Sequence, residues 1–157
     1  MRKIGIIAVL ALMVTALAAV PALAVSPHFL FANASTNSSG ALVVSFKEAG
    51  LGNITTTPIS VNTDYEVTYG CFNGGGKHPQ AANKETFFGD ATVSDNFPVR
   101  NGQTTGSLTV PVPGPGDFAC PPGQRLRLIS VTYSNITITG AAGTISTTPS
   151  TLTFPTP

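Results

Sequence analysis

The sequence predicts an all-β protein, and two observations lead to this fold class. Apolar and polar residues alternate over short stretches, and glycine, proline and asparagine residues separate these stretches roughly every eight to twelve positions. No apolar run at helical spacing extends beyond about two turns. Short strands joined by frequent turns are typical of a single-domain antiparallel β-sandwich, and a small β-barrel is the alternative.

The N-terminus, residues 1–24, is expected to be a signal peptide rather than part of the fold. Arg2 and Lys3 give it a positive start, and a long apolar run without charges follows. A proline and a small-x-small sequence ending at Ala24 are typical of a secretory cleavage site, whereas the apolar run is at the short limit for a spanning helix. Cleavage after Ala24 would release residues 25–157 as a secreted, extracellular protein without a membrane anchor.

The charge balance argues against two classes of partner. Only 10% of the chain is charged, and acids and bases nearly balance once Arg2 and Lys3 are removed. Nucleic acids and anionic membranes select clusters of lysine and arginine. We therefore expect neither of them, and the expected partner is an extracellular ligand or a component of the cell surface.

The segment of residues 25–40 is rich in serine and asparagine, and it is expected to be an arm that leads into the domain. It has room for a short edge strand at residues 27–31. The sandwich itself is expected to occupy residues 41–157, which is the length of one domain with one core.

Regular alternation marks the strand at residues 64–72 most clearly. Tyr65, Val67, Tyr69 and Cys71 share one face, and polar residues occupy most of the other. Such alternation is typical of a strand with one buried side and one side in water.

The other strands are less regular. Pro58 demotes the Thr-rich strand at residues 54–60 to a sheet edge, because proline cannot donate to the ladder. Asn101 and Gly102 predict a tight hairpin turn. The longest apolar strand changes phase near Ile129, which indicates either a β-bulge or burial of both faces. The expected strands, joined by turns that include one at 61–63, are 41–47, 54–60, 64–72, 86–94, 104–112, 124–134, 135–140, 144–148 and 151–154.

An immunoglobulin-like arrangement is the expected variety of sandwich. The pattern of antibody domains is absent, since the chain has no tryptophan to pack on a disulfide.

The two cysteines, Cys71 and Cys120, are predicted to form a disulfide. They lack the spacing of metal ligands, and a cysteine pair in an exported protein is typically oxidised; a metal site or a reactive thiol is the alternative. Closing a loop of about fifty residues would stabilise the fold by on the order of 4 kcal/mol through the unfolded state. The bond would tie together two loops rich in glycine and proline, residues 73–79 and 113–122.

These two loops supply the candidate binding residues. Lys77 and His78 follow three consecutive glycines, and Phe118 lies in the stiff proline-rich loop. Working residues are usually displayed on loops of a rigid scaffold, so a ligand or partner is expected to contact Lys77, His78 or Phe118. The alternative is that both loops are ordinary connections that the disulfide joins for stability.

Catalytic, metal and cofactor sites are not predicted. Neither histidine accompanies a nucleophile motif, and Asp64 and Glu66 have only the spacing of neighbours on one strand face. The acids are too scattered for a calcium loop, and the three glycines lack the spacing of a phosphate loop.

Three segments together resemble small secreted proteins of filamentous actinobacteria that have no assigned activity. They are SFKEAGLGN (residues 45–53), YGCFNGGGKHPQAANKE (residues 69–85) and PGPGDFACPPGQRL (residues 113–126). The resemblance covers most of residues 25–157. It implies a bacterial exported β protein in which Cys71 and Cys120 are paired, and it carries no site residues.

Two classes of function follow from the sequence. The favoured class is a non-enzymatic extracellular module, either a structural component of the cell surface or a binding domain. The alternative is a small secreted enzyme or protease inhibitor that acts through residues 73–79 and 113–122. A carbohydrate-binding module is the less favoured kind of binding domain, because the chain has no tryptophan and its tyrosines are expected to face the core mainly.

Overall fold

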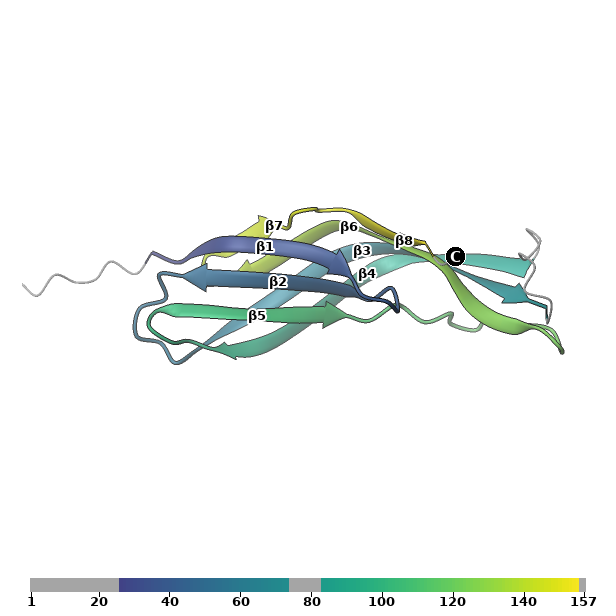
Figure 1. Cartoon of the computed structure of the whole chain (residues 1–157), viewed down its shortest axis with the longest axis horizontal. Coiled ribbons are helices and arrows are strands. Elements are labelled where there is room, and N and C mark those ends of the chain that lie inside the picture. The colour runs from purple at the N-terminus through teal and green to yellow at the C-terminus, as the bar shows by residue number, and fades with distance from the viewer. Residues whose placement is uncertain (1–25, 74–82, 156–157) are drawn as a thin grey trace, which may run out of the picture.

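The computed structural model describes residues 26–73 and 83–155, and it consists of two antiparallel sheets that pack face to face (Figure 1). Sheet A contains β1 (His28–Thr36), β2 (Leu42–Ala49) and β5 (Gln103–Val110), in the order β1-β2-β5. Sheet B contains β3 (Thr56–Phe72), β4 (Lys84–Pro98), β6 (Arg125–Gly140), β7 (Gly143–Ser146) and β8 (Leu152–Pro155), in the order β4-β3-β6-β7, with β8 also paired to β6. The all-β sandwich is confirmed, and the small barrel is not formed.

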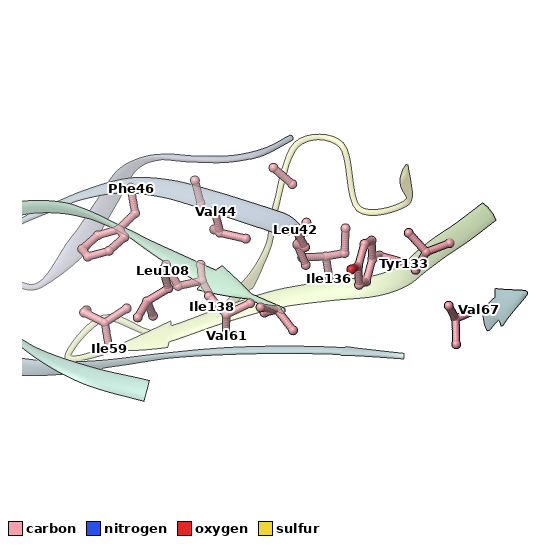
Figure 2. Close-up of a cluster of buried hydrophobic side chains, with 14 residues drawn as sticks. Leu42, Val44, Phe46, Ile59, Val61, Val67, Leu108, Tyr133, Ile136 and Ile138 are labelled. Atoms are coloured by element: carbon pink, nitrogen blue, oxygen red, sulfur yellow. The ribbon is translucent and has the colours of Figure 1, made fainter. Parts of the chain in front are cut away.

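The core lies where the inward faces of the two sheets meet. Leu42, Val44 and Phe46 alternate along β2 and are fully buried. They face Ile59 and Val61 of β3 across the interior (Figure 2). Burying each of these side chains contributes about 1.5–3 kcal/mol, so the period-two pattern of the sequence is the main source of stability.

Strand β3 is longer than the sequence predicts. The expected strands at 54–60 and 64–72 form one continuous strand of 17 residues, and the turn expected at 61–63 is wrong. Val61 and Thr63 continue the buried alternation, which keeps the chain extended through this point. Pro58 is tolerated because the ladder between β3 and β6 ends at Ser60, so proline has β4 as its neighbour on one side only.

Strand β6 likewise joins two expected strands, and it accommodates the change of phase with a bulge. Thr68 and Tyr69 of β3 pair with Ser130 and Leu128, which leaves Ile129 as the extra residue. The bulge returns Leu128 to the buried side of the sheet, on the face that Val131 occupies. The bulge near Ile129 is therefore confirmed.

The segment expected to lead into the domain contains β1, which pairs with β2 along its whole length. The far edge of β1 is also occupied, because Thr148 donates to the Ala32 carbonyl at 2.9 Å and accepts from the Ala34 amide at 3.1 Å. Residues of the connection between β7 and β8 thus close this side of the sandwich.

The hairpin between β4 and β5 has the tight turn that the sequence predicts. Arg100 and Gln103 exchange both backbone hydrogen bonds, at 2.8 and 3.0 Å. Asn101 and Gly102 between them have φ values of 51° and 71°. Asparagine and glycine are the residues that adopt these positive angles at least cost, which is why this dipeptide stands here.

Sheet B extends well beyond sheet A (Figure 1). Its three main strands have 15 to 17 residues, against eight or nine in the strands of sheet A. The buried side of the projecting half therefore needs another cover. That cover is the connection between β5 and β6, residues 111–124, which we name the cover segment.

Candidate functional site

The disulfide that the sequence predicts is present. Cys71 at the end of β3 bonds to Cys120 in the cover segment, with an S–S distance of 2.06 Å, and Cys71 is buried. The Tyr69 hydroxyl, two residues away, donates to the Pro113 carbonyl at 2.7 Å. These two connections hold the cover segment against the projecting half of sheet B.

The three binding residues expected on the tied loops are only partly placed. Lys77 and His78 lie outside the described residues. Phe118 is half-buried in the cover segment, where its amide donates to the Pro115 carbonyl at 3.0 Å in a tight turn. The cover segment thus contacts the sheet at Cys71 and Tyr69, and burial raises the pKa of Tyr69.

A groove lies at the other end of β3. It has a volume of about 400 Å³, and the apolar residues Ile54, Pro58, Ile59 and Ala141 are among those that line it. It is separated from Cys71 by on the order of 40 Å along the extended strand. The groove and the Cys71–Cys120 disulfide therefore lie at opposite ends of β3.

A buried carboxylate lies close to this groove. Glu48 is fully buried, and its Oε1 accepts a hydrogen bond from the Ala142 amide at 2.6 Å. Gly140 passes so close to it that a Cβ there would come within 2.8 Å of Glu48 Oε2. Glycine is needed at this position because the carboxylate occupies the space of a side chain.

The most regular surface of the molecule is the outer face of sheet B. Residues that oppose each other on neighbouring strands form rows of side chains on this face. These rows cross β4, β3 and β6, and most of them then reach β7 or β8. We name this surface the polar face. Its residues are Ser60, Asn62, Asp64, Glu66 and Thr68 of β3; Thr86, Phe88, Asp90, Thr92 and Ser94 of β4; Ser130, Thr132, Ser134, Thr137 and Thr139 of β6; Thr144 and Ser146 of β7; and Thr153 of β8.

Cross-strand hydrogen bonds fix many of these side chains. Each bond joins two side chains of directly opposed residues, so the donors and acceptors are oriented before any partner arrives. The bonds are Thr68–Thr86 at 2.9 Å, Asn62–Thr92 at 2.6 Å, Thr132–Thr153 at 3.0 Å and Thr139–Thr144 at 2.8 Å.

One aromatic ring stands in the middle of the polar face. Phe88 is 72% exposed, the largest exposure among the exposed large apolar side chains of the described residues, and it lies opposite Glu66. Asp64 and Asp90 oppose each other in the next row. Asn135, at a positive φ of 52°, donates from its Nδ2 to Asp64 Oδ2 at 2.7 Å and holds that carboxylate in place.

The charges on this side of sheet B are separated along the strands. The residues of the polar face include three carboxylates and neither lysine nor arginine. Cations appear beyond it, toward the disulfide, where Arg127 lies over the Phe72 ring at 5.6 Å and Lys84 pairs with Gly70. The centre of the polar face is therefore acidic, and the part of sheet B beyond it, toward the disulfide, carries the cations.

The polar face was not predicted from the sequence, although one signal was available. In residues 84–94 every second position is polar except position 88, so Phe88 interrupts a hydrophilic set. An apolar ring at a water-facing position points to a binding role, whereas a buried phenylalanine is ordinary and indicates only packing.

Neither a metal cluster nor a membrane-spanning helix is found in the part of the chain that the structure describes. Among the described residues, no three or more histidine, cysteine or carboxylate side chains are grouped so as to hold a metal ion. Over residues 26–73 and 83–155, the chain contains no helix with the length and apolar character needed to cross a membrane.

Comparison of the chain with protein-family models, with curated proteins and with solved structures finds no match.

Proposed function

We propose that the protein is a secreted, non-enzymatic binding module of the cell exterior, and that it binds a neutral glycan on the polar face. The observation that carries the proposal is the exposed ring of Phe88 among oriented hydroxyl and carboxylate groups. The predicted signal peptide and the disulfide support export, because structural disulfides are typical of oxidising compartments.

The chemistry of the polar face favours a hydroxyl-rich partner. An aromatic ring offers an apolar platform to the C–H side of a sugar, while hydroxyls and carboxylates exchange hydrogen bonds with its OH groups. Cross-strand hydrogen bonds have already ordered many of these side chains, which lowers the entropic cost of binding.

Charge and area argue against other partners for this surface. Asp64, Glu66 and Asp90 repel anionic polymers such as nucleic acids and acidic lipids. One phenylalanine is too small an apolar area for a hydrophobic protein interface, which needs a larger buried centre. A neutral polymer rich in hydroxyl groups satisfies both conditions.

We infer further that the sandwich is immunoglobulin-like. Its first, second and fifth strands share one sheet and its third, sixth and seventh share the other, as in that fold. The fourth strand joins the second sheet in this chain and thereby widens the polar face.

The alternative class, an enzyme or protease inhibitor acting through residues 73–79 and 113–122, has one observation in its favour. The disulfide between Cys71 and Cys120 would stiffen such loops, as inhibitors require. The half-burial of Phe118 weakens the case, because a buried part of this side chain is not available to a protein partner.

A pull-down with three insoluble neutral polymers, cellulose, chitin and a β-1,3-glucan, tests the proposal. We expect residues 25–157 to bind at least one of these polymers, and Phe88→Ala to weaken that binding at least tenfold, about 1.4 kcal/mol. Phe31→Ala is the matched control, since Phe31 is also an exposed phenylalanine, at 39%, but lies on β1 of sheet A.

If the Phe88→Ala variant binds as tightly as the Phe31→Ala variant, the polar face is not the binding site. Binding that is lost instead in a triple alanine variant of Lys77, His78 and Phe118 would transfer the function to the tied loops.

A further inference from the structure

Strand β4 forms one edge of sheet B, and its far side has no strand beside it among the described residues. It pairs with β3 over 15 consecutive positions, from Pro98 to Lys84, without any register shift. No backbone hydrogen bond joins the outer edge of residues 84–90 to another residue in the described part of the chain. A long, regular edge of this kind is a template for pairing with another strand.

Natural proteins protect such edges with bulges, prolines or charged side chains along the strand. In β4, the proline and the lysine stand at the two ends, Pro98 and Lys84, and the ladder contains no bulge. The charges within the strand are all acidic, so they disfavour a second acidic strand but can pair with a lysine of the partner; they are Glu85, Asp90 and Asp95. The part nearest Lys84 also belongs to the projecting half of sheet B, where sheet A does not reach (Figure 1). Within residues 26–73 and 83–155, nothing pairs with the outer edge of its backbone, so a second strand can pair there.

We propose that two copies of this chain pair antiparallel through β4, about a two-fold axis at Phe87. In that register, residues at equal distances on either side of Phe87 oppose each other. Lys84 of each copy then lies opposite Asp90 of the other copy, which gives two ion pairs across the axis. Thr86 lies opposite Phe88 of the second copy.

The charges of β4 select this register. The axis must pass through a residue position, because only then do the polar faces of both copies lie on the same side. An axis at Asp90 would set Asp90 against its own copy and Glu85 against Asp95, which is repulsive. Within β4, only an axis at Phe87 places Lys84 opposite an acidic residue.

Pairing in this way would join the two B sheets into one continuous sheet. The shared ladder would run over residues 84–90 of each copy, roughly 24 Å of strand. Both Phe88 rings would lie on the same surface, either side of the axis. The dimer does not depend on glycan binding, since no ligand takes part in it.

Sedimentation equilibrium of residues 25–157 without any glycan tests the dimer. We expect a concentration-dependent dimer for the wild type. Lys84→Glu and Asp90→Lys each place like charges in opposition, and each should raise the dimer dissociation constant at least tenfold. The double variant with both changes reverses every ion pair and should restore dimerisation.

Ser94→Lys is the matched control, because it adds a charge to β4 on the same face but outside the shared ladder. It should leave the dimer intact, and thermal melting of each variant checks that it is folded. A chain that stays monomeric up to about 1 mM, where even a dimer of millimolar affinity would be populated, would overturn the proposal. If the wild type dimerises but the double variant stays monomeric, the proposal is also overturned, because the two copies would then not pair through β4 in this register.

Discussion

The side chain of Tyr133 shows how one buried polar group links stability to pH. Its ring is fully buried, and its hydroxyl donates to the Gly40 carbonyl at 3.0 Å, which ties β6 to the turn before β2. Burial disfavours the phenolate and raises the pKa of Tyr133 to about 12. In the unfolded chain the same group ionises near its ordinary pKa of about 10.

This difference predicts a loss of stability at alkaline pH. Below pH 10 the group is protonated in both states and its contribution is fully present. As the pH rises toward 12, the unfolded state ionises first, which costs up to about 2–3 kcal/mol of folding free energy. Urea unfolding of the wild type between pH 8 and 11.5 should show this decline.

Tyr133→Phe is the variant that isolates the group. It should cost about 1 kcal/mol at pH 8, through the lost hydrogen bond to Gly40, and then lose less stability than the wild type as the pH rises. Parallel pH profiles for the two proteins would contradict the assignment to Tyr133.

At the scale of the element, the cover segment replaces sheet A over the projecting half of sheet B. Its hold depends on the Cys71–Cys120 bond, which closes a loop of 49 positions, and on the contact of Tyr69 with Pro113. Without them the apolar side chains of that half would face water.

Replacing Cys71 and Cys120 together with serine should therefore act locally as well as globally. The free energy of unfolding should fall by about 4 kcal/mol, the chain-entropy value for such a loop. Hydrogen exchange should rise most in residues 66–72 and 125–131, while β2 keeps its protection. Equal acceleration in β2 would mean that the cover segment is not a separate unit of stability.

Most of the strands could be predicted from the sequence, but the residues at which each strand begins and ends could not. Leu42, Val44 and Phe46 are marked by alternation alone, and Asn101 and Gly102 by their turn chemistry. The false turn at 61–63 arises because polar residues there resemble a loop locally, whereas pairing with β4 and β6 keeps them extended. Such non-local pairing outweighs local propensity.

At the scale of the whole molecule, sheet B carries both proposed interactions. The sequence directs attention to the tied loops, because glycine, proline and cysteine are visible there without a structure. The polar face is assembled from five strands, and its rows of side chains form only when these strands pair in register. Phe88 was therefore recognisable as unusual, but its neighbours Glu66 and Thr132 were not.

The polar face is the proposed binding surface of the protein. NMR titration of isotope-labelled residues 25–157 with soluble oligomers of glucose and of N-acetylglucosamine tests it most directly. We expect amide shift changes confined to residues 62–68, 86–92 and 130–134. Shift changes concentrated in the cover segment or around the groove at Ile59, with the polar face unperturbed, would contradict the claim.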